Sequence, residues 1–107
     1  SNKLHFYTKY SKEKIKISAK PFASGGEGAI YAIASPRSYS HLVAKIYYPE
    51  KRTPEREAKM QYLMQHPPIE FQEGQAPSIG WVQDLVYKDK RFIGILLIKI
   101  DGKKLTN

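Results

Sequence analysis

The sequence predicts an α+β domain: a five-stranded antiparallel sheet with one packed helix. Five short segments are either apolar or alternate between apolar and polar residues, which is typical of strands. One segment has the start signal, the apolar periodicity and the proline stop of a helix. The order is three strands, one helix and two strands. Connections are short outside the helix, as in a meander with one excursion.

Three strands are expected before the helix, over residues 14–18, 29–34 and 42–48. Ile15 and Ile17 alternate with polar neighbours, so the first strand is expected to be half-buried. The other two are short apolar runs. The third is interrupted by a single charge, and Pro49 stops it.

The helix is expected to begin after Thr53, a hydroxyl cap, with Pro54 at the first helical position and acids in the first turn. It is expected to run to about His66, where two consecutive prolines end it. Its apolar stripe, at spacings of three and four residues, consists of Met60, Leu63 and Met64.

Two further strands, over 79–87 and 92–100, are expected after a loop at 70–77. The charged turn 88–91 joins them. The second of these strands is apolar on both faces, which predicts a central strand covered on both sides.

Composition indicates one small domain. The 107 residues are 41% hydrophobic and 12% aromatic, enough for a compact core. Residues 1–14 are polar and rich in lysine, so we expect an N-terminal arm followed by a domain over 15–107. The absence of cysteine fits a reducing compartment, and no apolar run approaches the roughly 20 residues of a membrane span. We therefore expect a cytoplasmic protein with no membrane partner.

The formal charge is +8, from 18 basic and 10 acidic residues. Such a surplus suggests nucleic acid as a partner. The lysines, however, are spread over nearly every segment, which favours a solvated basic surface and makes nucleic-acid binding unlikely. The three histidines are scattered without a second ligand at a useful spacing, so no metal site is expected.

The glycine cluster Gly25, Gly26 and Gly28 is a candidate phosphate-binding loop, because glycine lets the backbone N–H groups approach a ligand closely. A strand-like segment follows it, whereas a dinucleotide-binding loop requires a helix there. The chain also lacks the Gly-Lys-Ser/Thr triplet of a Walker loop. The remaining possibility is a loop between two strands that folds over a nucleotide.

Such a loop requires a lysine on the next strand and a carboxylate to orient it. Lys45 lies in an apolar run, where a charge is costly without a partner or ligand. Glu57 shares a helix face with Met60 and Met64, towards the sheet, whereas Glu55 lies on a more polar side. We expect an ion pair between Lys45 and Glu57. The alternative is that Lys45 extends its charge to solvent and Glu57 is an ordinary surface acid.

Four segments in this order resemble the N-terminal (small) lobe of protein kinases: the glycine loop and its flanks over 22–31, the lysine motif 42–45, the glutamate stretch 57–60 and the hinge-like segment 97–105. The sequence over residues 49–55 is similar to that of a bacterial branch of Ser/Thr kinase-like proteins. The fold implied is the kinase small lobe, ending at the hinge.

The resemblance implies the following roles. Gly25, Gly26 and Gly28 cover the ATP phosphates. Lys45 contacts phosphate oxygens and forms the catalytic ion pair with Glu57. At the adenine, Ile30 and Val43 sandwich the base, Leu97 is the gatekeeper, and the backbone of Ile98 and Ile100 bonds the base edge.

Three departures bear on affinity for ATP. Ala23 stands where the first glycine is usual, and Val43 where a smaller alanine is typical. The interval from Lys45 to Glu57 is also shorter than usual. The 107 residues contain neither His-Arg-Asp nor Asp-Phe-Gly. Mg²⁺ is therefore expected only if a large lobe is present, and this chain alone is not expected to transfer phosphate.

Three functions follow as hypotheses. The first is the ATP-binding small lobe of a kinase-like phosphotransferase, with the kinase C-lobe as a partner. The second is a kinase-like interaction module with vestigial nucleotide binding, and the third is a basic nucleic-acid-binding β domain. A lone lobe exposes the apolar cleft around Ile30, Val43, Leu97 and Ile100, so self-association through that face, by strand exchange for example, is also expected.

Overall fold

The strands expected from alternation and apolar runs all form, and two further strands join them. The computed structural model describes residues 5–68 and 80–99. Its strands are β1 His5–Thr8, β2 Lys14–Ile17, β3 Ala23–Ser24, β4 Gly28–Ser35, β5 Leu42–Tyr47, β6 Val82–Lys88 and β7 Arg91–Ile98. The helix α1, Pro54–Gln65, follows β5, with short 3₁₀ turns at Arg37–Tyr39 and Pro49–Lys51. The loop expected over 70–77 lies outside the described residues.

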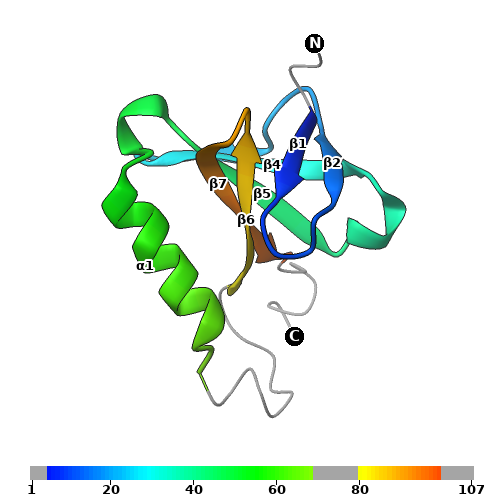
Figure 1. The fold of residues 1–107 in the computed structure, drawn as a ribbon. Coiled ribbons are helices and arrows are strands. Elements are labelled where there is room, and N and C mark those ends of the chain that lie inside the picture. The colour runs from blue at the N-terminus through cyan, green and yellow to red at the C-terminus, as the bar shows by residue number, and fades with distance from the viewer. Residues whose placement is uncertain (1–4, 69–79, 100–107) are drawn as a thin grey trace, which may run out of the picture.

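Six of these strands close into an antiparallel barrel in the order β2-β1-β6-β7-β5-β4 (Figure 1). Closure comes from a pairing between β2 and β4, in which Ile17 lies opposite Ile33. On the other side of the hairpin, β1 joins β6 through Tyr7 opposite Tyr87. The two-residue strand β3 is attached to β4 beside the barrel.

The predicted fold class, an open five-stranded sheet with a packed helix as in the kinase small lobe, is therefore wrong. The hairpin β1–β2 bridges β6 and β4 and turns the sheet into a closed barrel. Residues 5–8, expected to belong to an arm, form one of its strands. Only two of these four side chains, Phe6 and Thr8, are buried, so the hydrophobic signal of the strand is weak in the sequence.

The barrel interior holds the first of two apolar clusters. Ile15, Ala44, Val86 and Leu96 contribute four of its side chains and have no exposed surface. Each large aliphatic side chain buried in this way stabilises the fold by roughly 1.5–3 kcal/mol. Strand β7 lies between β5 and β6 and is buried over residues 92–96, which confirms the prediction of a central strand covered on both sides.

Helix α1 begins as its sequence predicts. The Thr53 hydroxyl accepts a hydrogen bond from the backbone N–H of Arg56 at 3.1 Å, and Pro54 occupies the first helical position. The helix ends at Gln65, just before the two prolines. No helix in the described ranges is long and apolar enough to cross a membrane.

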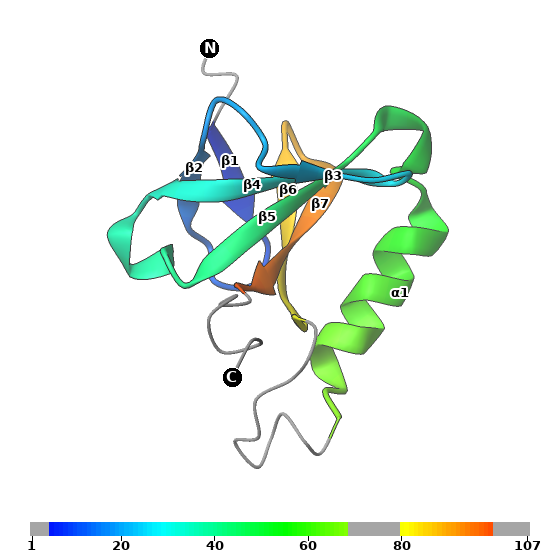
Figure 2. The ribbon, with the colours of Figure 1, turned by 180° about the vertical axis from the view of Figure 1, so that it is seen from behind.

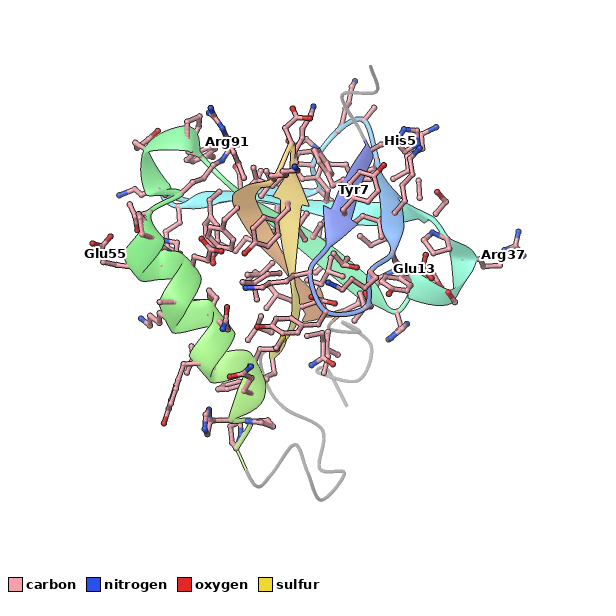
Figure 3. The ribbon with its side chains drawn as sticks, viewed as in Figure 1. His5, Tyr7, Glu13, Arg37, Glu55 and Arg91 are labelled. Carbon is pink, nitrogen blue, oxygen red and sulfur yellow. The ribbon has the colours of Figure 1, made fainter. Side chains whose placement is uncertain are left out.

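The helix packs on the outer surface of the barrel, to one side of β6 and β7 (Figure 2). Its apolar stripe contacts the second cluster, as predicted, and Trp81 anchors it by donating from Nε1 to the Leu63 carbonyl at 2.9 Å. Glu55 projects away from the barrel (Figure 3). On the barrel, the buried side chains of this second cluster are Tyr47, Val82, Leu85, Phe92 and Ile95.

A buried carboxylate holds the turn between β1 and β2. Asp84 on β6 is 4% exposed and accepts hydrogen bonds from the backbone N–H groups of Tyr10 and Ser11, each at 2.9 Å, and of Leu85 at 2.8 Å. Three such donors satisfy a charge that would otherwise be costly to bury. Asp84 thereby ties the β1–β2 hairpin to β6.

Candidate functional site

The glycine cluster forms the tight turn between β3 and β4. Ala23 pairs with Ile30, and the Gly25 N–H donates to the Gly28 carbonyl at 3.0 Å. A side chain at Gly25 or Gly26 would meet nothing within 4 Å, whereas a Cβ at Gly28 would lie 2.3 Å from the Ile46 carbonyl oxygen. Gly28 is therefore required by packing. Gly25 and Gly26 leave their side of the loop open to a ligand.

Lys45 points to the same loop from β5. It lies opposite Ile30 in the β4–β5 ladder, so the two side chains share a face of the sheet. Its Nζ is 3.0 Å from Glu27 Oε1, and the Lys45 side chain remains 27% exposed. The charge in this apolar strand thus has a partner, and both residues line a pocket.

That pocket, of about 260 Å³, is lined by Lys45, Ile30 and the loop residues 23–28. Its lining includes five residues that the sequence analysis assigned to nucleotide binding: Gly25, Gly26, Gly28, Ile30 and Lys45. Pockets for whole small molecules usually measure about 300–1,000 Å³. The space is therefore smaller than a pocket that holds a whole small molecule.

A second cation, Arg56, reaches the loop from the first turn of α1. Its Nη1 lies 3.0 Å from Glu27 Oε2, so one carboxylate bridges Lys45 and Arg56. The Arg56 guanidinium lies over the Tyr47 ring, 4.8 Å from its centroid, and Lys45 Nζ lies 5.6 Å from the same centroid. The buried Tyr47 ring is thus a common platform for both cations.

The charges at this cluster shift the pKa values of its members. Hydrogen bonds from Lys45 and then from Arg56 lower the pKa of Glu27. Burial raises the pKa of Tyr47. For Arg56, partial burial works to lower the pKa, but hydrogen bonds to Glu27 and Tyr47 outweigh it and the pKa is raised. All three groups therefore keep their usual ionisation at neutral pH: a carboxylate, a neutral phenol and a guanidinium.

Glu57 faces the barrel as expected, but its partner is not Lys45. The Tyr87 hydroxyl donates to Glu57 Oε2, whereas Lys45 pairs with Glu27. Burial, followed by this hydrogen bond, raises the pKa of Tyr87. The predicted ion pair between Lys45 and Glu57 is thus not formed in this structure, because each of the two side chains has a nearer partner.

The residues assigned to adenine are only partly brought together. Val43 and Leu97 lie opposite each other on β5 and β7, on the face that carries Lys45, but Val43 is only 6% exposed. The Ile98 N–H donates to the Trp81 carbonyl at 3.4 Å. Ile100 lies outside the described residues. Of the predicted adenine site, the structure pairs the buried Val43 with Leu97, and only Ile30 lines the pocket at the glycine loop.

A larger cavity, of about 770 Å³, lies between the start of α1 and the β6–β7 turn. It is lined in part by Arg52, Glu57, Tyr87 and Arg91. The hydrogen bond between Glu57 and Tyr87 already satisfies the two polar groups that face each other there. None of the glycine-loop residues contributes to it.

Two members of the cluster, Glu27 and Arg56, were missed by the sequence reasoning. Glu27 stands inside the glycine cluster, between Gly26 and Gly28, and nothing in the local sequence indicates the partner of its carboxylate. Arg56 precedes Met60 by four residues, which places it on the barrel-facing side of the helix. This four-residue spacing from the apolar stripe is the sequence signal that indicates a barrel-facing Arg56.

Comparison of the chain with family models, with curated proteins and with solved structures finds no match.

Proposed function

We propose that this domain binds ATP through its glycine loop and Lys45, as the nucleotide-binding part of a kinase-like phosphotransferase of the Ser/Thr type. One observation carries the proposal: the pocket under the glycine loop is lined by five of the residues that the sequence assigned to the nucleotide. In this proposal the loop N–H groups and Lys45 bind the phosphates, and Ile30 contacts the nucleoside side.

Catalysis is not part of the proposal for this chain alone. Among its 107 residues no His-Arg-Asp or Asp-Phe-Gly motif supplies the base and the Mg²⁺ ligand of phosphoryl transfer. A kinase C-lobe, as a partner, would bring both and would complete the site with Mg²⁺. A cytoplasmic location, where ATP is available, belongs to the same proposal.

Calorimetry with ATP tests the assignment of Lys45. Replacing Lys45 by Ala removes the phosphate-binding charge, and we expect binding to weaken about tenfold or more, since a charge-assisted hydrogen bond contributes roughly 1.5–3 kcal/mol. Lys51, a partly exposed lysine on the neighbouring 3₁₀ turn, provides the matched control as Lys51→Ala. Equal affinities in the wild type and Lys45→Ala would contradict the assigned role.

The interaction-module hypothesis has its own support, because Lys45 pairs with Glu27 and not with Glu57. It predicts no heat with ATP from the wild type or from variants of the loop. The nucleic-acid hypothesis predicts binding of DNA or RNA that falls steeply with salt, and a gel shift at micromolar protein tests it.

A further inference from the structure

The ion-pair cluster at the glycine loop holds one carboxylate between two cations. Glu27 accepts from Lys45 through Oε1 and from Arg56 through Oε2, each at 3.0 Å. The three side chains come from the loop, from β5 and from α1, so three separate elements converge on one point. The two oxygens of the carboxylate occupy positions that two oxygens of a phosphate could take between the same cations.

The charge balance of the cluster favours a dianion over this carboxylate. Glu27 carries one negative charge and its partners carry two positive charges. A terminal phosphate with close to two negative charges would balance the cations fully and would bring more acceptor oxygens. Arginine is well suited to this role because its planar fork binds phosphate through two parallel hydrogen bonds.

Glu27 can leave its position without a change in the loop. Its side chain is 47% exposed. Its backbone, in contrast, is held, since the Glu27 carbonyl accepts from the Tyr48 N–H at 2.9 Å. Rotation of the side chain to solvent would open the space between the cations and keep the loop hydrogen bonds.

Arg56 is already held in place for a ligand. Its backbone N–H is bound by the Thr53 cap, and its guanidinium lies on the buried Tyr47 ring. An arginine fixed at both ends loses little further conformational freedom when it binds an anion.

We propose that the Glu27 carboxylate occupies the position of a nucleotide phosphate, and that Arg56 is a second phosphate-binding cation beside Lys45. The proposal deepens the ATP-binding function and rests on it. Glu27 then competes with the nucleotide. The affinity for ATP therefore depends on how much more strongly the two cations bind the phosphate than they bind the Glu27 carboxylate.

The test measures the binding of ATP, tripolyphosphate and adenosine to the chain and to four variants. Arg56→Gln removes the second cation, and Arg56→Lys restores a charge without the fork. Glu27→Gln keeps the shape of the side chain and removes its charge. Arg37→Gln is the matched control, since Arg37 is exposed on a 3₁₀ turn at the far side of the barrel (Figure 3). Thermal unfolding of each variant establishes that it is folded.

We expect Arg56→Gln to weaken ATP and tripolyphosphate about tenfold and to leave adenosine unchanged, because tenfold corresponds to about 1.4 kcal/mol, the scale of one charged hydrogen bond. Arg56→Lys should fall between Arg56→Gln and the wild type. Glu27→Gln should bind ATP and tripolyphosphate at least about threefold more tightly than the wild type does.

The outcomes separate the two proposals. If Arg56→Gln binds ATP as Arg37→Gln does, or if Glu27→Gln binds it more weakly than the wild type, the role of Glu27 and Arg56 is overturned. The ATP-binding function still stands in that case if Lys45→Ala weakens binding. If neither the wild type nor Glu27→Gln binds ATP, the proposed function falls. Arg56-dependent binding of tripolyphosphate would then support the anion site alone.

Discussion

Gly25 and Gly28 stand three positions apart in one cluster, and the folded chain gives them opposite surroundings. Gly25 borders open space, whereas Gly28 lies against the backbone of β5, where a Cβ would be 2.3 Å from the Ile46 oxygen and 2.8 Å from the Tyr47 Cα. Backbone atoms cannot yield as the end of a flexible side chain can. The cluster thus combines a glycine needed by the fold with glycines that border open space.

Gly28→Ala should therefore destabilise the domain by about 2 kcal/mol or more, in the range of overpacked cores. Urea unfolding of the variant measures the loss. Gly25→Ala is the control, and we expect its free energy of unfolding to stay within about 0.5 kcal/mol of the wild type, as for other exposed changes. Equal stability of the two variants would show that β5 moves away from the loop at little cost.

At the same scale, five of the nine residues that the sequence assigned to the nucleotide line this pocket, but their ion pairs were not predicted. Gly25, Gly26, Gly28, Ile30 and Lys45 come together because the β3–β4 turn and the β4–β5 ladder are set by local pattern. The partner of Lys45 depends on how α1 docks. Its docking brings Arg56 to Glu27 and Glu57 to Tyr87. Which acid pairs with Lys45 therefore depends on tertiary packing, and short-range sequence patterns do not predict it.

Among the elements, α1 was the most completely predicted. Its cap, its first proline, its stripe and its end all follow from short-range rules. The strands 29–34 and 42–48 were predicted for the same reason: each is an apolar run bounded by turn residues. The short strand β1 was missed because four residues carry too little alternation to be recognised.

The Thr53 cap gives a prediction for this helix. Thr53→Ala leaves the Arg56 N–H without its side-chain acceptor and should lower the free energy of unfolding by about 1 kcal/mol. Thr53→Ser keeps the hydroxyl and should retain most of that stability. Chemical denaturation followed by circular dichroism compares the two. A Thr53→Ala variant as stable as the wild type would mean that water replaces the cap without loss.

For the whole molecule, the closed barrel depends on contacts between distant parts of the chain. Asp84 fixes the β1–β2 turn, and Tyr7 pairs with Tyr87. Closure also pairs the long edges of the sheet, which leaves fewer unpaired backbone groups for edge-to-edge addition of another chain. Self-association by strand exchange stays a prediction. Association through the face of Ile30 and Leu97 stays a prediction, which light scattering can test.

Asp84→Ala should loosen the hairpin and destabilise the domain by about 3 kcal/mol, since it removes a charged acceptor shared by three buried or partly buried N–H groups. Hydrogen exchange should show the greatest loss of protection in β1 and β2. Glu13→Ala, at an exposed position in the same turn, should leave both measurements close to the wild type. Uniform loss of protection across the whole barrel would contradict a local role for Asp84.

The pairing of β1 with β6 also determines when folding can finish during synthesis. Thr8, near the beginning of the chain, lies opposite Val86, which leaves the ribosome only after β5 and α1. Until then Phe6 and Ile15 have no barrel to enter, and the early hairpin must wait with its apolar side uncovered. Pairings this distant in sequence are slow to form, so we expect closure of the barrel, and not the helix or the hairpins, to set the folding rate.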